Sequence, residues 1–199
     1  MGHVQAFDLK HLISEFDLKV YVETGTGIGD SLSHALNFSE FEEIHSIEID
    51  KNLYEKALIN FRDPRLKIHN KYSKEALPEI LGTAKNCLFF LDAHFPEADF
   101  GTAPDRYQVS LQKYGKDALP LEEELSIIHQ MRPQSKDVLI IDDVWIYEKG
   151  PFETGNWIEQ DKLNIGNMNF VSDIFKNTHD ISKFYKQQGY LLLLPKRII

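Results

Sequence analysis

The sequence predicts a doubly wound α/β fold: a mostly parallel sheet of seven strands, covered by helices, whose C-terminal strand runs antiparallel. Strand-like and helix-like hydrophobic patterns alternate along the chain, which implies parallel strands joined by right-handed crossovers. The segments at residues 87–91 and 138–141 are continuously apolar, as expected for strands covered on both faces. Two final strand-like segments flank a turn at residues 187–189, which predicts a closing hairpin.

Each element has a local signal. The predicted strands are residues 20–23, 43–49, 66–69, 87–91, 138–141, 181–185 and 190–194. The predicted helices are residues 9–16, 30–37, 50 or 52 to about 61, 73–81, 119–131 and 169–176. Asp30 or Ser31 can cap the second helix, and Pro120 suits the first turn of the fifth. Apolar residues recur at helical spacing within 119–131, at Leu121, Leu125, Ile128 and Met131.

Length and charge limit the possible partners. The 199 residues suit one domain spanning residues 1–199. With 22 Lys and Arg against 31 Asp and Glu, the net charge is −9, which disfavours binding to a nucleic acid backbone. Cys87 is the one cysteine, so an internal disulfide is excluded. No apolar run approaches the roughly 20 residues of a membrane span, and the N-terminus lacks a signal-peptide pattern. We expect a cytoplasmic protein with a small-molecule substrate, no nucleic acid and no membrane; a homodimer stays open.

A glycine-rich turn follows the first strand, with the sequence Glu23-Thr24-Gly25-Thr26-Gly27-Ile28-Gly29-Asp30. Glycines let the backbone turn sharply and let a ligand lie directly against it. A dinucleotide fingerprint needs a sixth-position glycine where Asp30 stands, and a P-loop would need a following Lys-Ser or Lys-Thr. The turn is either a simple tight loop or a cradle for a cofactor without phosphate. In the second case Glu23 is placed to hold a cationic amino group.

A second acidic residue, Glu48, ends the second strand 19 positions after Gly29. That interval is typical of an acid that accepts hydrogen bonds from ribose hydroxyls. For Asp50, two positions later, we favour a helix cap over a ligand role.

Together these residues resemble the first two motifs of class I S-adenosylmethionine-dependent methyltransferases, which have a Rossmann-like fold with an antiparallel last strand. The resemblance covers residues 18–195. It implies that Glu23 faces the methionine amino group, that the glycine turn lies under the cofactor, that Glu48 binds the ribose, and that residues 71–73 lie near the adenine. The implied cofactor-binding residues are Glu23, Gly25, Thr26, Gly27, Gly29, Ser31, Glu48, Ile49, Tyr72, Ser73 and Asp92.

Carboxylates follow strands four and five: Asp92 after one, Asp142 and Asp143 after the other. If these strands are neighbours, the three carboxylates converge and repel one another unless a cation such as Mg²⁺ neutralises them. The arrangement is similar to metal-dependent O-methyltransferases of the catechol and macrolide-sugar types, which implies a Mg²⁺ site at Asp92, Asp142 and Asp143. By the same resemblance Asp92 is placed at the reaction centre, and His94 is a candidate general base.

Structural roles remain as alternatives for all four residues. Asp142 can cap a turn, Asp143 can be a solvated loop acid, Asp92 can contact the cofactor alone, and His94 can be a hydrogen-bonded structural histidine. The acidic run 122–124 begins a helix, where negative charge is favourable, although one of its members can position substrate.

The leading hypothesis is therefore an enzyme that transfers a methyl group from S-adenosylmethionine to a small molecule, with a hydroxyl of a sugar, phenol or natural product as the expected acceptor and Mg²⁺ as a possible aid. Two alternatives stay open. One is a nucleotide-dependent oxidoreductase, which Asp30 disfavours, and the other is a non-catalytic domain that binds the cofactor.

Overall fold

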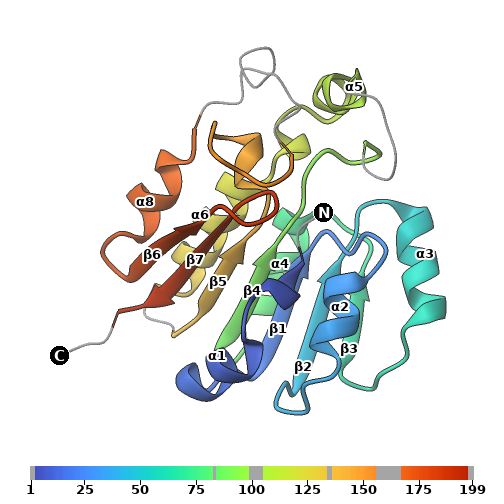
Figure 1. Ribbon diagram of the computed structural model, residues 1–199. Coiled ribbons are helices and arrows are strands. Elements are labelled where there is room, and N and C mark those ends of the chain that lie inside the picture. Colours follow the sequence, from blue (N-terminus) through green and yellow to red (C-terminus); the bar gives the residue numbers. More distant parts are fainter. Residues whose placement is uncertain (1–2, 83, 99–104, 134–135, 156–166, 197–199) are drawn as a thin grey trace.

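A computed structural model describes residues 3–82, 84–98, 105–133, 136–155 and 167–196. Its centre is a seven-stranded sheet with the order β3-β2-β1-β4-β5-β7-β6 (Figure 1). The strands are β1 (Val20–Thr24), β2 (Glu43–Ile47), β3 (Leu66–His69), β4 (Cys87–Leu91), β5 (Val138–Ile141), β6 (His179–Phe184) and β7 (Tyr190–Pro195). Strand β7 is antiparallel to both β5 and β6, whereas the other pairings are parallel. The predicted fold class and the antiparallel final strand are confirmed.

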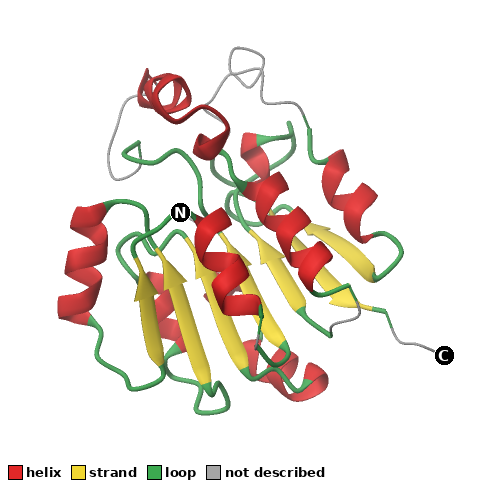
Figure 2. Ribbon diagram, turned by 180° about the vertical axis from the view of Figure 1, so that it is seen from behind, coloured by secondary structure: helices red, strands yellow, loops and turns green. Residues whose placement is uncertain are grey.

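Helices cover both faces of the sheet. On one face, α4 (Ser73–Leu81), α6 (Leu121–Met131) and α8 (Asn169–Phe175) pack on alternate residues of β1, β4 and β5, and these helices stand in front of the sheet in Figure 2. On the other face, the N-terminal turn η1 (Val4–Ala6), α1 (Leu9–Phe16) and α2 (Asp30–Ala35) pack on the intervening residues. Helix α3 (Lys51–Asn60) follows β2. Successive side chains along each central strand therefore point to opposite faces of the sheet and contribute to two separate apolar clusters.

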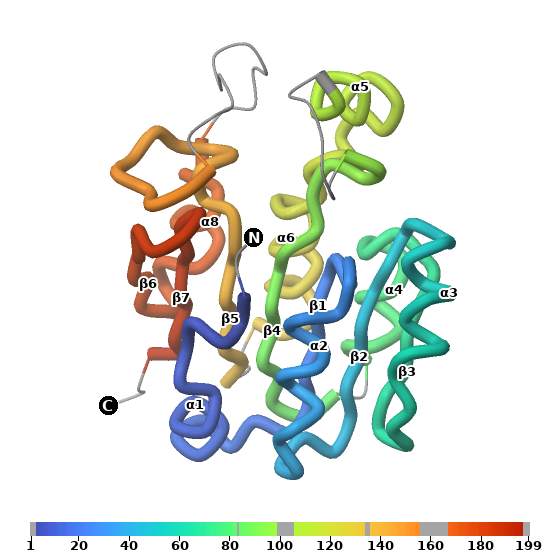
Figure 3. Tube along the Cα trace, turned by 45° about the vertical axis from the view of Figure 1, so that its right-hand side comes forward, coloured from blue at the N-terminus to red at the C-terminus, as the bar shows by residue number. Residues whose placement is uncertain are grey.

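The order of the strands reverses between β1 and β4. From β1 the chain proceeds to β2 and β3 on one side, and from β4 it proceeds to β5 on the other. Ligands of doubly wound sheets bind beyond the carboxyl ends of the strands at such a switch point. Helix α5 (Asp105–Tyr114) and the short turn η2 (Gly115–Ala118) stand over this edge (Figure 3).

Helix α5 is the main element that the sequence does not predict, because residues 96–119 have the pattern of a long connection. Its inward residues are Tyr107, Ser110, Leu111 and Tyr114, of which Tyr107 and Ser110 are buried. These positions have helical spacing, but a serine and two tyrosines make the apolar stripe weak, while Val109 is exposed.

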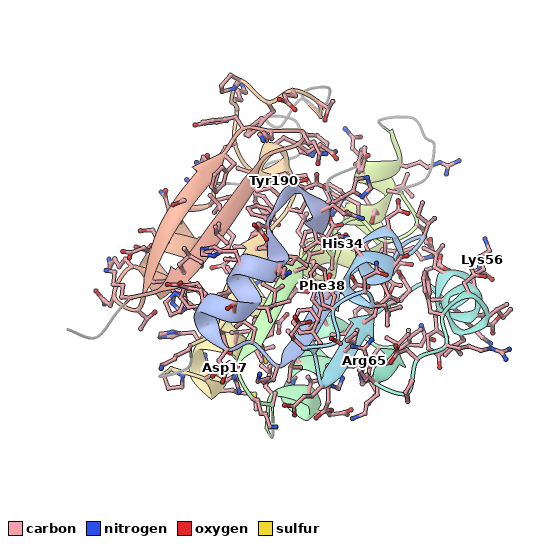
Figure 4. All side chains as sticks on the ribbon, turned by 60° about the horizontal axis from the view of Figure 1, so that its bottom comes forward. Asp17, His34, Phe38, Lys56, Arg65 and Tyr190 are labelled. Atoms are coloured by element: carbon pink, nitrogen blue, oxygen red, sulfur yellow. The ribbon has the colours of Figure 1, made fainter. Side chains whose placement is uncertain are left out.

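The N-terminal segment is fastened to the far side of the sheet. Tyr190 lies beside η1 (Figure 4), and its hydroxyl oxygen accepts a hydrogen bond from the backbone N–H of His3 at 2.9 Å. Phe7 packs edge-on against the ring of Tyr190, with 5.2 Å between the ring centres. This fastening brings His3 to the carboxyl edge. No helix within the described residues is both long and apolar enough to cross a bilayer; the cytoplasmic location stays a prediction.

Candidate active site

A cavity of about 680 Å³ opens at the carboxyl edge, above the switch point between β1 and β4. Its volume lies in the usual range for small-molecule sites. The predicted cofactor-binding residues that line it are Gly25, Thr26, Gly27, Gly29, Ser31, Glu48, Ile49, Tyr72, Ser73 and Asp92. His94 and Asp143 line the same cavity, whereas Glu23 and Asp142 are not among its lining residues.

The glycine turn forms the floor of this large cavity. The backbone N–H of Gly25 donates to the carbonyl of Ile47 at 2.9 Å, and that of Gly29 donates to Thr26 at 2.9 Å. Gly25 has a φ of +83°, and a Cβ placed there would come within 2.7 Å of the Asp92 carbonyl oxygen. Only glycine fits this left-handed position and its close approach to the backbone after β4. Helix α2 then begins at Asp30, and its N-cap is Gly29, so the prediction that Asp30 or Ser31 caps this helix is wrong.

Glu48 closes one side of the turn. One carboxylate oxygen accepts from the backbone N–H of Gly27 at 2.9 Å, and the other accepts from Asp50 at 2.8 Å. The side chain is 6% exposed, and burial raises its pKa above the ordinary value although both backbone hydrogen bonds lower it. Each oxygen retains a second lone pair for a ligand hydroxyl. Asp50 caps α3 by accepting from Asn52 and Leu53, so the predicted capping role is confirmed.

Glu23 lies beneath the turn, away from the cavity. Its carboxylate accepts hydrogen bonds from the Ser46 hydroxyl at 2.6 Å and from the Tyr21 hydroxyl at 3.0 Å. The Ser46 oxygen is also 2.5 Å from the Thr26 hydroxyl oxygen, which connects Glu23 to the turn. Burial raises the pKa of Glu23 to about 8, against the effect of both hydroxyls. In this arrangement Glu23 supports the turn from below, and its contact with a methionine amino group stays a prediction.

The sheet register brings the residues after β4 and β5 together. Leu91 pairs with Ile141, and the backbone N–H of Asp142 donates to the Leu91 carbonyl at 3.0 Å. Three side chains then form an acid–histidine trio, Asp92, His94 and Asp143, in which one potential ligand atom from each lies within 4.8 Å of the others. Asp142 is not part of this trio, although it was predicted as a metal ligand.

The imidazole of His94 has an oxygen at each ring nitrogen. Nδ1 lies 3.0 Å from the backbone carbonyl oxygen of Asp92, and Nε2 lies 2.9 Å from Oδ2 of Asp143. The other oxygen of Asp143 accepts from the indole N–H of Trp145 at 2.9 Å. Asp143 itself has a left-handed backbone with φ +55°, a conformation that costs energy and is common at functional sites. Both partners of the His94–Asp143 pair are therefore held in place by further contacts.

Behind the trio lies a small cavity of about 10 Å³, roughly the room of one water molecule. Its polar lining consists of Asp92, His94, Glu124, Asp142, Asp143 and Tyr147. Asp142 accepts from the backbone N–H of Asp143 at 2.7 Å with Oδ1, but its Oδ2 has no hydrogen-bond partner among the described residues. Burial, followed by the charge of Asp143, raises the pKa of Asp142 well above its ordinary value.

Glu124 is the site residue that the sequence did not single out within its acidic run. Glu122 and Glu123 are exposed, whereas Glu124 is fully buried. Its Oε2 accepts from the Thr24 hydroxyl at 3.3 Å, and its Oε1 has no hydrogen-bond partner among the described residues. Burial raises its pKa to about 7, against the effect of the Ser73 and Thr24 hydroxyls. The helical period carried a signal, because Glu124 stands on the same face as Leu121, Leu125 and Ile128.

Comparison with solved structures identifies the architecture. The chain is similar to a candidate caffeoyl-CoA O-methyltransferase from Staphylococcus aureus, with a TM-score of 0.56 and 15% identity over 94% of this chain and 81% of that one. A candidate S-adenosylmethionine-dependent methyltransferase from Listeria monocytogenes has a TM-score of 0.55 and 15% identity over 96% of this chain and 97% of that one. The chain has the fold of the S-adenosylmethionine-dependent methyltransferases.

A third similar structure contains a ligand. A candidate methyltransferase from Streptococcus mutans, solved with S-adenosylhomocysteine (SAH), has a TM-score of 0.52 and 11% identity over 94% of this chain and 97% of that one. No protein-family model and no curated protein sequence matches the chain. The predicted resemblance to methyltransferases is thus confirmed at the level of the fold. The comparisons do not identify the molecule that accepts the methyl group.

Proposed function

We propose that this protein transfers a methyl group from S-adenosylmethionine to a hydroxyl group of a small molecule. The observation that carries the proposal is that one cavity is lined both by the glycine turn with Glu48 and by the acid–histidine trio. The first set is suited to a nucleoside with an amino-acid tail. The second set is suited to an acceptor that must lose a proton. S-adenosylmethionine supplies an activated methyl group on a sulfonium, so the protein has to align and deprotonate the acceptor.

His94 and Asp143 are the pair that can manage the acceptor proton. Nε2 lies 2.9 Å from Oδ2, a hydrogen-bonding distance at which a protonated Nε2 donates to the carboxylate. As the base, His94 needs an unprotonated Nε2 that accepts from the substrate hydroxyl in place of the Asp143 contact, and it then donates the proton it has gained to the Asp143 carboxylate. The contact of Nδ1 with the Asp92 carbonyl keeps the second ring proton on Nδ1 and fixes the orientation of the ring.

A divalent cation also fits the trio. Asp92 and Asp143 offer carboxylate oxygens within 4.8 Å of each other. Glu124 and Asp142 line the adjoining small cavity, and each has one buried oxygen with no hydrogen-bond partner among the described residues. When bound, such an ion lowers the pKa of a coordinated hydroxyl. The sequence predicts Mg²⁺ with Asp142 as a ligand, and we retain Mg²⁺ as the reference ion for the experiment. Four further predictions accompany this proposal. They are a single domain, a cytoplasmic location and no nucleic acid partner, with a homodimer left as an alternative to the monomer.

The first test concerns the cofactor. Because a ligand that binds only the native state stabilises it, millimolar SAH should raise the melting temperature, whereas NADH should not. Calorimetry should give a matching dissociation constant for SAH. A shift with NADH and none with SAH would contradict the proposal and favour the oxidoreductase alternative.

The second test concerns the acceptor. Formation of SAH should be measured with a panel of catechols, sugars and amines, with EDTA and after restoring Mg²⁺. We expect turnover with a hydroxyl acceptor, loss of turnover in EDTA and recovery with Mg²⁺. A turnover rate that EDTA does not change would favour His94 and Asp143 as a metal-free acid–base pair. SAH binding without turnover on any acceptor class would favour a non-catalytic domain.

A further inference from the structure

The acid–histidine trio differs from an ion site made of oxygen ligands alone, because His94 adds an imidazole nitrogen to it. Nε2 of His94 points to Oδ2 of Asp143, and ligand atoms of Asp92, His94 and Asp143 lie within 4.8 Å of one another. Mg²⁺ prefers oxygen ligands and an octahedral set that retains water. Imidazole nitrogen instead favours first-row transition metals, whose affinity for nitrogen-containing sites exceeds that of Mg²⁺.

A second observation points to a ligand at the same place. Four acidic residues, Asp92, Asp142, Asp143 and Glu124, line the small cavity behind the trio, and no Lys or Arg is among its described lining residues. Two of the buried oxygens, Oε1 of Glu124 and Oδ2 of Asp142, have no hydrogen-bond partner among the described residues. Buried polar atoms are costly when they are left unpaired. A cation bound at the trio would provide the positive charge that these oxygens face.

Helix α6 explains how Glu124 reaches the site. Glu124 follows Leu121 by three positions and precedes Ile128 by four, so it shares the apolar face that packs on the sheet. Its Oε2 accepts from the Thr24 hydroxyl at the end of β1, Oε1 has no hydrogen-bond partner within the part of the chain that the structure describes, and Glu124 lines the small cavity. The carboxyl group therefore approaches the trio from a different element than the strand-end residues do.

We propose that Asp92, His94 and Asp143 bind a first-row transition-metal dication in preference to Mg²⁺, and that Glu124 belongs to this site as an additional carboxylate. The inference deepens the proposed function, on which its catalytic meaning rests, but binding of the ion can be measured without cofactor or acceptor. In this assignment Nε2 of His94 is a metal ligand and no longer a base, so the bound ion would lower the pKa of the acceptor hydroxyl in its place. Asp143 is held by Trp145 on its other oxygen. Asp142 lies behind the trio and is not a member of it.

The test uses the full chain, freed of metal, without S-adenosylmethionine or acceptor. Co²⁺ is titrated in and followed by its visible absorption, which reports the ligand set, and Mg²⁺ is then used as a competitor. We expect Co²⁺ to bind at least tenfold more tightly than Mg²⁺. In His94→Gln the ratio of the two affinities should fall at least tenfold and the absorption bands should shift, because a nitrogen ligand is lost. In Glu124→Gln both affinities should fall at least fivefold while the ratio is kept.

Glu122→Gln is the matched control, since Glu122 lies in the same helical turn but is exposed, and it should bind both ions as the unaltered chain does. Unchanged Co²⁺ affinity and bands in His94→Gln would overturn the nitrogen ligand. Unchanged affinities in Glu124→Gln would remove Glu124 from the site. Should that variant fail to fold, Glu124→Asp is the second variant, because it retains the charge on a shorter side chain. It should still lower the affinity for both ions.

SAH binding to each variant separates this inference from the proposed function. A chain that binds SAH but neither ion overturns the metal site and leaves the methyltransferase proposal standing. A chain that binds Co²⁺ selectively but not SAH supports the metal site and contradicts the methyltransferase proposal.

Discussion

At the scale of single residues, Glu48 serves the protein and its expected ligand with the same carboxylate. It accepts from the backbone N–H groups of Gly27 and Asp50 while it lines the large cavity. Glu48→Ala should weaken SAH binding at least tenfold, because hydrogen bonds to a charged acceptor contribute about 1.5–3 kcal/mol each and the glycine turn also loses a contact. Calorimetry on the variant measures this, with Glu48→Gln as the milder comparison. An unchanged dissociation constant would move the ribose role to Asp50.

The acidic residues of the site also show which side-chain positions can be predicted from the sequence. The interval between Gly29 and Glu48 predicts that Glu48 lies at the ligand, and the structure places it in the cavity lining. The spacing does not tell which way a strand residue faces, so it does not predict that Glu23 lies beneath the turn with Tyr21 and Ser46. For Glu124, three consecutive acids suggest a solvated helix start, and the inward direction depends on tertiary packing of α6.

At the scale of elements, the turn between β1 and α2 depends on Gly25. Gly25→Ala places a Cβ 2.7 Å from the Asp92 carbonyl oxygen at a φ of +83°, so either the turn or the chain after β4 must move. The left-handed backbone alone costs about 1–2 kcal/mol for an alanine. We expect a lower free energy of unfolding in urea and SAH affinity reduced at least tenfold. Gly82→Ala is the control, because its backbone is right-handed helical and its Cβ would meet only the Pro78 carbonyl oxygen at 3.9 Å. It should leave SAH affinity unchanged and should not lower the free energy of unfolding. Equal effects in the two variants would contradict the special role of the turn.

The elements that the sequence predicts well are those with a strong period. All seven strands and the helices that pack on the sheet were expected close to their observed places, because buried strands are continuously apolar and the helices have apolar stripes. Helix α5 was not, since Tyr107 and Ser110 make a weak stripe. Tyr107 and Thr154, which lie in the segments that follow β4 and β5, line the large cavity.

At the scale of the whole molecule, the buried acid under the turn makes stability depend on pH. The pKa of Glu23 is about 8 in the folded chain and has an ordinary value of 4.5, so between these pH values the native state holds a proton that the unfolded chain has lost. The free energy of unfolding should therefore fall as the pH rises through this window, by at most about 1.4 kcal/mol per pH unit from this group. Glu124 and Asp142, whose pKa values are also raised, act in the same direction, while His45, with its pKa lowered to about 4, acts in the opposite one.

Comparison with Glu23→Gln isolates the contribution of Glu23 from those of the other groups. The amide in this variant has no ionisable proton, and the hydroxyls of Tyr21 and Ser46 can each donate or accept, so the local contacts can be kept. Urea unfolding at pH 5.5 and at pH 7.5 should show that the unaltered chain loses more stability over this interval than Glu23→Gln does. Relative to the unaltered chain, the variant should thus gain stability between pH 5.5 and pH 7.5, because its folding does not require the uptake of a proton at this position. Equal losses in the two proteins would mean that Glu23 is already ionised at pH 5.5, in which case a positive group of a ligand could be attracted to it from the glycine turn.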